Sequence, residues 1–205
     1  MYSRGCIIIS GDVGSKWVFQ AKKDAADTTK PDSLQVSGVD YFDTFTPVAC
    51  LASIWTVLAF AASENYETGQ IDIKGAYLND ELTKDEVIYM KQPPGYSISA
   101  ENGKILVCWL QKTLYGLKQS GRCWYQKLVE FMEKLGFKRS DVDQAVFYQQ
   151  GEGKLIIMLV HVEGCTIVAN AQPLITCFKI EIAKHIEITD SGDLHWILSI
   201  EVLWI

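Results

Sequence analysis

The sequence predicts an α+β domain, and three observations lead to that class. Two continuously apolar, β-branched runs, residues 155–160 and 165–169, flank the short connection His161-Val162-Glu163-Gly164, which is typical of a tight β-hairpin. Apolar side chains recur at helical spacing over residues 122–135. Because the predicted strands and helices mix without a regular βαβ alternation, we expect an α+β fold rather than a parallel α/β sheet.

The first half of the chain predicts two strands, a loop and a helix. Residues 16–22 (KWVFQAK) have the pattern of a strand, and residues 23–38 that of a polar, proline-containing loop. Residues 51–62 predict a buried helix, for which Ser53 is a plausible N-cap. Residues 69–74 predict a central strand, in which two isoleucines alternate around an aspartate.

The second half predicts further strands, two helices and the hairpin. Residues 86–90 and 105–110 read as strands around a Pro-Pro-Gly loop. The helix at residues 122–135 is well placed to end at Gly136. After the hairpin we expect a helix at residues 174–184 and a terminal strand near residues 195–202. The positions expected in the core are Trp55, Leu58, Phe60, Trp124, Leu128, Phe131, Leu159 and Val168.

Composition is that of a globular protein with reduced cysteines. With 205 residues and 48% hydrophobic content, the chain is long enough for one core or two small subdomains. The six cysteines show no CxxC pair, and the three histidines have no metal-ligand spacing, so neither a disulfide framework nor a zinc site is expected. Residues 6–9 form an apolar patch too short for a signal peptide, and residues 54–62 are too few to span a bilayer. We therefore expect a cytoplasmic or nuclear protein with no membrane role.

The net charge of −6 argues against autonomous binding of nucleic acid. Affinity for nucleic acid comes largely from cations that neutralise phosphates, and the basic residues of this chain are scattered. A local positive groove remains compatible with this composition, but the overall field would not assist it.

Two acidic residues are candidates for a site. Glu163 lies at the tip of the predicted hairpin, although a lone turn glutamate is more often simply exposed. Asp72 lies between Ile71 and Ile73 in a short strand, where a buried unpaired carboxylate would be costly. Two acids from distant parts of one sheet make a possible site for divalent cations, which favour oxygen ligands.

Several further segments carry a resemblance to a known family. They are GVDYFDTFTPVA at 38–49, QIDIKGAYLN at 70–79, VIYMKQPPGY at 87–96, LYGLKQ at 114–119 and LGFKRS at 135–140. In order and spacing they closely resemble the reverse transcriptase of copia-type LTR retrotransposons, an RNA-dependent DNA polymerase. The resemblance runs over residues 13–205, with residues 1–12 left unassigned. It implies the palm and part of the fingers of a polymerase right hand, the palm being an antiparallel sheet backed by helices.

The resemblance also implies roles for individual residues. Polymerases use two divalent cations, here expected to be Mg²⁺, to stabilise the attacking and leaving oxygens of an in-line displacement. Asp72 matches the metal ligand of the first strand, and Glu163 the first of two consecutive hairpin aspartates. Tyr77 matches the residue that favours deoxynucleotides, although ordinary aromatic packing is its alternative role. Finally, Gly116, Lys118 and Gln119 match the segment beneath the incoming nucleotide and template. The expected partners are therefore a deoxynucleoside triphosphate and an RNA or DNA primer–template.

Three departures from the family pattern bear on activity. Gly164 replaces the second hairpin aspartate and supplies no carboxylate. Glu163 keeps one, but its extra methylene moves the oxygens by roughly 1.5 Å, where catalytic geometry tolerates about 0.5 Å. In the family a lysine- and arginine-rich fingers strand occupies the interval that is here residues 24–37, whose only basic residue is Lys30. We also expect no thumb or RNase H domain after the palm.

The sequence thus leaves three interpretations open. The first is a copia-type reverse transcriptase domain that is catalytically dead or severely impaired, with weak binding of primer–template. The second is a residually active polymerase that uses Asp72 and Glu163 with a relaxed metal requirement. In the third, the palm scaffold serves as a non-enzymatic interaction module, whose protein partners the sequence does not identify.

Overall fold

The computed structural model describes residues 22–23, 29–30, 35, 38, 41–78, 82, 88–92, 98–99, 106–198 and 200–203. The chain forms two compact units. We call residues 46–76 and 125–205 the sheet unit, and residues 1–45 and 77–124 the second unit.

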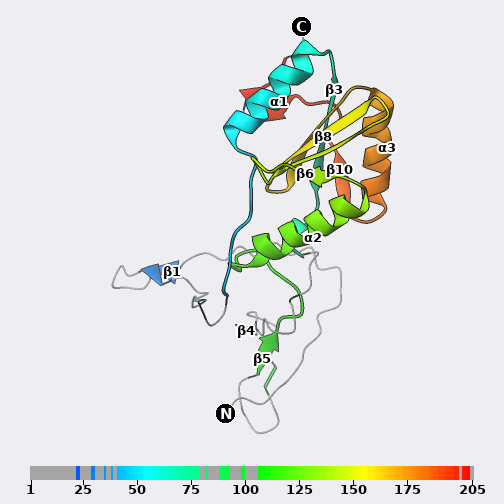
Figure 1. Ribbon diagram of the computed structural model, residues 1–205. Helices are drawn as coiled ribbons and strands as arrows, with labels where there is room; N and C mark the ends of the chain where they lie inside the picture. The colour runs from blue at the N-terminus through cyan, green and yellow to red at the C-terminus, as the bar shows by residue number, and fades with distance from the viewer. Residues whose placement is uncertain are drawn as a thin grey trace. The chain divides into compact units, whose positions relative to one another are not determined.

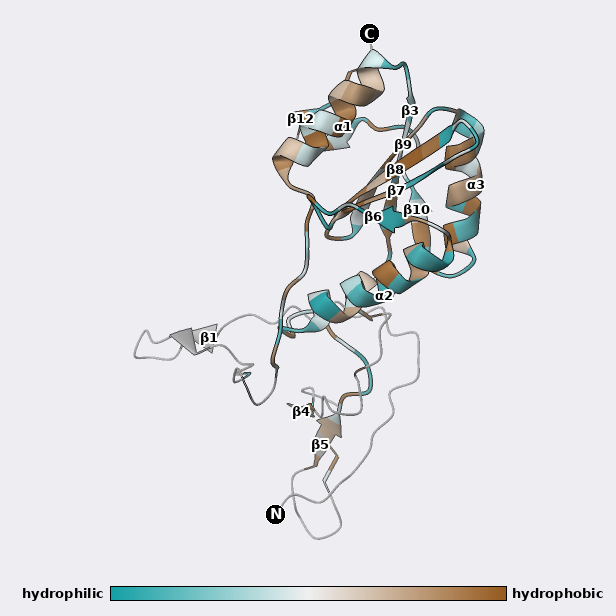
Figure 2. Ribbon diagram, viewed as in Figure 1, coloured by the Kyte–Doolittle hydropathy of each residue, from teal (hydrophilic) through white to brown (hydrophobic). Residues whose placement is uncertain are grey.

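The sheet unit is built on six strands in the order β10-β3-β9-β8-β7-β6 (Figure 1). Every neighbouring pair in this sheet is antiparallel. The strands are β3 (Glu67–Ile73), β6 (Lys138–Arg139), β7 (Val146–Gly151), β8 (Lys154–His161), β9 (Gly164–Ala169) and β10 (Ile188–Asp190). The hairpin of β8 and β9 is central, and β8 is strongly hydrophobic (Figure 2). Such continuous apolar runs are typical of strands covered on both faces.

Alternation along β3 defines two faces of this sheet. Gly69, Ile71 and Ile73 lie on one, which we call the Ile71 face, and Gln70 and Asp72 lie on the other, the Asp72 face. Directly paired residues on neighbouring strands share a face, so the pairing register extends both faces across β8 and β9.

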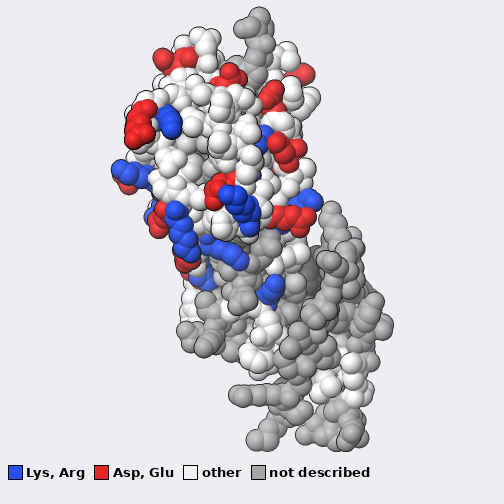
Figure 3. Space-filling model, turned by 90° about the vertical axis from the view of Figure 1, so that its right-hand side faces the viewer, with Lys and Arg blue, Asp and Glu red and all other residues white. Residues whose placement is uncertain are grey.

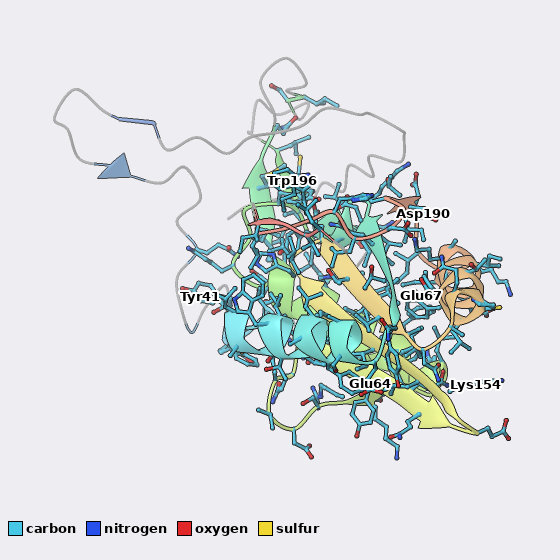
Figure 4. All side chains as sticks on the ribbon, turned by 90° about the horizontal axis from the view of Figure 1, so that it is seen from above. Tyr41, Glu64, Glu67, Lys154, Asp190 and Trp196 are labelled. Atoms are coloured by element: carbon cyan, nitrogen blue, oxygen red, sulfur yellow. The ribbon has the colours of Figure 1, made fainter. Side chains whose placement is uncertain are left out.

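Helices cover both faces. The Ile71 face packs against α3 (Gln172–Ala183), because a Cβ added at Gly69 would lie 2.8 Å from Ile175. On the Asp72 face, Ile54 of α1 (Leu51–Ser63) lines a cavity together with Gln70. Seen from above, α1 and α3 lie on different sides of the strands (Figure 4). A short hairpin of β11 (Trp196–Ile197) and β12 (Ile200–Glu201) adds to the Asp72 face, since Trp196 and Ile197 line the same cavity.

The helix α2 (Ser120–Lys134) contributes its later residues to the sheet unit. Tyr125 stacks at a tilt against Phe147 of β7, and its hydroxyl donates to the carbonyl of Gln144. The helix ends as the sequence predicts: Gly136 has a positive φ of 82°, and the N–H of Phe137 donates to the carbonyl of Met132. Phe137 then packs against Phe178 of α3.

The second unit contains two small antiparallel ladders. One pairs β1 (Lys22–Lys23) with β2 (Thr29–Lys30), and the other pairs β4 (Tyr89–Lys91) with β5 (Val107–Trp109). A 3-10 turn, η1 (Ala76–Leu78), follows β3 along the chain.

The predicted α+β class is confirmed, as are the three helices and the central hairpin. The strands predicted at 86–90 and 105–110 are present but shorter among the residues described, and 16–21 of the predicted first strand lie outside them. Strands β2, β6, β7 and β10 were not predicted, and β2 lies within residues 23–38, which we expected to form a loop. Within the described ranges, no helix is both long and apolar enough to cross a membrane.

Three predictions are wrong. The N-cap of α1 is Cys50, whose sulfur accepts from the N–H of Ser53, and not Ser53 itself. Trp55 and Phe60 are not core residues, because they are 44% and 37% exposed. The terminal strand is instead the β11–β12 hairpin, since Leu198 adopts a positive φ of 51° that a strand does not allow. The other expected core residues are buried, except that Phe131 is only half-buried.

Candidate active site

Asp72 lies near the end of β3 with its side chain exposed. Its neighbours Ile71 and Ile73 are fully buried on the opposite face. Alternation along the strand therefore resolves the apparent conflict of an acid between two isoleucines. The hydrophobic pair anchors the strand, and the carboxylate is presented on the Asp72 face.

The β8–β9 hairpin closes with a two-residue loop. His161 pairs with Gly164, which leaves Val162 and Glu163 at the tip. Val162 has a φ of +58°, an outlier for a β-branched residue that costs on the order of 1–3 kcal/mol. The strain is confined to the tip, where the backbone must reverse within two residues.

Strand register brings four residues into one row across the Asp72 face. Asp72 pairs directly with Thr189 of β10 on one side and with Gly164 of β9 on the other. Gly164 pairs in turn with His161 of β8. In this row Gly164, rather than Glu163, is therefore the direct cross-strand neighbour of Asp72.

Gly164 has space for a side chain. A Cβ built there meets only the carbonyl oxygen of His161, at the ordinary contact distance of 3.6 Å, and the backbone φ is not in the left-handed region. Directly paired residues of an antiparallel ladder place their Cβ atoms roughly 4.5–5.5 Å apart. A carboxylate at position 164 would therefore face that of Asp72.

Glu163 is joined to β3 through its backbone. The N–H of Ile73 donates to the carbonyl of Glu163 at 2.8 Å, which fixes the hairpin tip one residue from Asp72. The Glu163 side chain is half-buried. The interpretation of Glu163 as a second metal ligand stays a prediction.

A small cavity of about 100 Å³ opens beside this row. Its lining includes His161, Gly164, Gln70 and Thr166 from the sheet and Trp196 from the β11–β12 hairpin. Trp196, labelled in Figure 4, is itself more than half exposed.

Cys165 lies behind the row, on the Ile71 face. Burial raises the pKa of its thiol to about 12, and the nearby negative charge of Asp72 adds to the effect. At neutral pH this cysteine is therefore a neutral core thiol, whereas Cys50 and Cys177 are exposed.

The remaining predicted residues gather in the second unit. The ring of Tyr77 contacts that of Tyr115 edge-to-face at 5.2 Å, and Thr113 donates its hydroxyl hydrogen to the carbonyl of Tyr77 at 2.5 Å. Gly116 has a φ of +98°, so a residue with a side chain would be strained in this turn. The turn leads into α2, whose first residue is Ser120.

Lys118 and Gln119 follow this turn and differ in exposure. Lys118 is exposed, whereas Gln119 is fully buried. Both are held by Gln35, whose amide accepts from the backbone N–H of Lys118 and donates to the side chain of Gln119. The structure thus groups Tyr77, Gly116, Lys118 and Gln119 in one unit, and Asp72 and Glu163 in the other.

The donor set of the Asp72 row does not fit a pair of carboxylate-bound cations. In the part of the chain that the structure describes, no three His, Cys, Asp or Glu side chains are grouped so as to hold a metal ion. Asp72 has glycine on one side and a threonine hydroxyl on the other. Cations of this kind need several oxygen ligands, and carboxylates are the strongest of them.

Sequence reasoning missed Thr189 and Gln35. Thr189 becomes part of the row only through the β10–β3 register. Gln35 lies 83 residues from Lys118, within an interval noted only for its lack of basic residues. No local pattern marks either residue.

Comparison with known proteins places this arrangement in context. The model of a family described as reverse transcriptase (RNA-dependent DNA polymerase) matches residues 10–205. The chain is 35% identical over 197 residues to the retrovirus-related Pol polyprotein from transposon TNT 1-94 of Nicotiana tabacum, and 34% identical to that from transposon RE1 of Arabidopsis thaliana. It is also 28% identical over 132 residues, 64% of this chain and 42% of the relative, to the putative transposon Ty5-1 protein YCL074W of Saccharomyces cerevisiae.

The matches cover most of this chain but little of the larger relatives. The aligned residues make up 92% of this chain, but only 14% of the tobacco polyprotein and 13% of the Arabidopsis one. No solved structure matches the chain significantly.

Proposed function

Because this chain belongs to the reverse transcriptase family, as the domain type found in copia-type Pol polyproteins, we propose that it is a polymerase palm whose catalysis is lost or severely impaired. Reverse transcriptases bind a primer–template and deoxynucleoside triphosphates and use divalent metal ions. The six-stranded antiparallel sheet, with helices on both faces, supports the palm assignment. The proposed site is the exposed end of β3 beside the β8–β9 hairpin.

One observation carries the proposed loss of activity: the residue paired with Asp72 is Gly164. A metal held correctly by carboxylates contributes several kcal/mol of charge stabilisation to phosphoryl transfer. With glycine at this position, Asp72 has no carboxylate neighbour directly across the strand. Glu163 offers a carboxylate from the loop, one residue before Gly164, and Mg²⁺ bound to it and Asp72 would be held weakly.

The chain retains the residues expected to bind and orient a nucleotide, but not a full set of metal ligands. Lys118 is exposed and would offer its cation to a triphosphate, and the ring of Tyr77, which contacts Tyr115, would face the sugar if it plays its family role. We expect this set to bind nucleotide only weakly, since residues 24–37 supply a single basic residue, Lys30, where the family carries several.

A primer-extension assay tests the proposal. The unmodified chain is incubated with an RNA template, a DNA primer and all four deoxynucleoside triphosphates, with Mg²⁺ or Mn²⁺. We expect no extension above that of an Asp72→Asn variant with either metal. Robust extension that Asp72→Asn abolishes would identify a working enzyme and overturn the proposal.

Repair variants extend the test. Losses within one catalytic unit do not add simply. Restoring the hairpin alone, with His161→Tyr, Glu163→Asp and Gly164→Asp, is therefore expected to give little extension. Grafting a basic fingers strand into residues 24–37 in the same chain should give more than either repair alone.

A further inference from the structure

Gln35 makes two hydrogen bonds to consecutive residues of the segment that precedes α2. Its Nε2 donates to Oε1 of Gln119 at 2.8 Å. Its Oε1 accepts from the backbone N–H of Lys118 at 2.7 Å. Both polar ends of one amide side chain are thus used on neighbouring residues.

The two bonds satisfy polar groups that the backbone hydrogen bonds of this turn do not. In the turn before α2, the N–H of Leu117 donates to the carbonyl of Leu114, and the N–H of Ser120 donates to that of Leu117. The N–H of Lys118 lies between them and is taken by Gln35. Gln119 is fully buried, so its amide oxygen requires a donor inside the protein, and Gln35 provides it.

This contact anchors the backbone at Lys118. Lys118 follows Gly116, whose positive φ gives the turn its shape but no rigidity of its own. With its backbone N–H anchored, the exposed Lys118 side chain projects from a fixed point. Binding to a pre-ordered group loses less conformational entropy than binding to a mobile one.

We infer that Gln35 is a positioning residue, which holds Lys118 and Gln119 in place for a deoxynucleoside triphosphate. The inference rests on the proposed function, because that function makes Lys118 and Gln119 nucleotide-binding residues. Although residues 24–37 are poor in basic residues, Gln35 in this interval would still influence nucleotide binding by holding Lys118 and Gln119.

Three variants of the full chain separate the effect of the hydrogen bonds from that of packing. Gln35→Met keeps the length of the side chain and removes the amide. Gln35→Glu keeps an acceptor for the Lys118 N–H, and the amide of Gln119 can turn to donate to it. Gln92→Met is the matched control, because Gln92 is a glutamine of the same unit that donates to the carbonyls of Ile98 and Leu106, away from Lys118.

Amide hydrogen exchange, followed by NMR on the ¹⁵N-labelled chain, tests the contact itself. We expect exchange at Lys118 to be roughly five- to tenfold faster in Gln35→Met and close to that of the unmodified chain in Gln35→Glu and Gln92→Met. Unchanged exchange at Lys118 in Gln35→Met would overturn the inference. So would a loss of protection spread over the whole unit, because that would make Gln35 a general structural residue.

Titration with a deoxynucleoside triphosphate and Mg²⁺ tests the consequence, with the Lys118 and Gln119 amide signals as the readout. Weak, millimolar binding is measurable in this way. We expect Gln35→Met to raise the apparent dissociation constant at least fivefold and Gln92→Met to leave it unchanged. If the unmodified chain binds and Gln35→Met binds equally well, the inference alone fails. If the unmodified chain shows no shift at Lys118 or Gln119, the nucleotide binding proposed for these residues fails, and the inference fails with it.

Discussion

Gly164 is the residue on which the proposed loss of activity depends. It pairs with Asp72, and its backbone conformation and surroundings accept a side chain. The absence of a carboxylate is therefore a matter of residue identity and not of fold.

We expect Gly164→Asp to fold and to gain a response to Mg²⁺. Two carboxylates at paired positions repel each other, at a cost of about 0.2–1 kcal/mol without metal. Added Mg²⁺ should relieve the repulsion and raise the melting temperature. Thermal melts with and without Mg²⁺ measure both effects.

The control for this prediction is Gly151→Asp, at a strand position where an added Cβ meets nothing within 4 Å. Gly151→Asp should show no response to Mg²⁺. The double variant Asp72→Asn with Gly164→Asp should lack the Mg²⁺ response of Gly164→Asp. An equal response in all three variants would mean that Mg²⁺ acts elsewhere on the protein.

Asp190 provides a residue-level test of the sheet edge. Its carboxylate is paired with Lys179 of α3 at 2.5 Å and accepts from the N–H of Gly192 at 2.9 Å. The hydrogen bond from Lys179, followed by that from the Gly192 backbone, lowers the pKa of Asp190 although burial opposes the shift. Asp190 is labelled at the edge of the sheet in Figure 4.

A lowered pKa in the folded state means that the pair stabilises the fold above the unfolded carboxyl pKa of about 3.9. The contribution is then lost as the pH falls through the lower folded pKa. We expect Asp190→Asn to reduce the free energy of unfolding by less than about 1 kcal/mol at pH 7, because the Asp190 side chain is 56% exposed. Urea denaturation should show this difference shrinking towards pH 3. A difference that is constant with pH would show that the charge is not responsible.

At the level of the elements, β3 and α3 approach closely at one glycine. A Cβ at Gly69 would lie 2.8 Å from Cγ2 of Ile175 and 3.3 Å from Cε of Lys179. Ile175 is fully buried, so it has no room to move aside.

We expect Gly69→Ala to destabilise the protein by about 1–3 kcal/mol through this overpacking. Gly151→Ala is the comparison, because nothing lies within 4 Å of an added Cβ there. Alanine lowers the conformational entropy of the unfolded chain, so this substitution should be neutral or slightly stabilising. Urea denaturation of both variants measures the contrast. If Gly69→Ala is as stable as Gly151→Ala, α3 does not pack this closely on β3.

The start of α1 shows how a distant residue completes an element. Cys50 caps the helix through its sulfur, and its own N–H donates to the carboxylate of Asp143 at 2.9 Å. Asp143 lies before β7 and also accepts from the N–H of Ala145. The helix N-terminus is therefore fixed by a carboxylate 93 residues away. The negative charge of Asp143 is also favourable there, because it lies at the positive end of the helix dipole.

For the whole molecule, charge governs association with nucleic acid. The net charge is −6, and acidic and basic side chains are interspersed on the face seen in Figure 3. Among the residues described, this face therefore lacks a continuous patch of cations that could neutralise the phosphates of a nucleic acid.

We expect the dissociation constant for an RNA–DNA primer–template to be no better than about 10⁻⁴–10⁻⁶ M at physiological salt. Fluorescence anisotropy over a range of salt concentrations measures it. A duplex of RNA and DNA and a single strand should bind with similar, strongly salt-dependent affinity. Tight, salt-resistant binding of the duplex would contradict this prediction and favour a residually active polymerase.

Sequence alone predicts the elements whose signals are local. The helix α2 follows from apolar spacing and a terminating glycine, and the β8–β9 hairpin from two apolar runs around a short connection. These features depend on neighbours within a few residues, where backbone geometry fixes which side chains share a face. The exposure of Asp72 was not predicted, although alternation along β3 accounts for it once the buried face of the strand is known.

The tertiary structure decides what depends on distant partners. Most residues of α1 are apolar, so periodicity does not select a buried side. Packing leaves Trp55 and Phe60 exposed. Register between strands, set by hydrogen bonds over long separations, makes Gly164 and Thr189 the neighbours of Asp72. The contact of Gln35 with Lys118 likewise joins residues far apart along the chain. Sequence thus determined the family and the local elements, whereas only the folded chain decided which residues meet at the site.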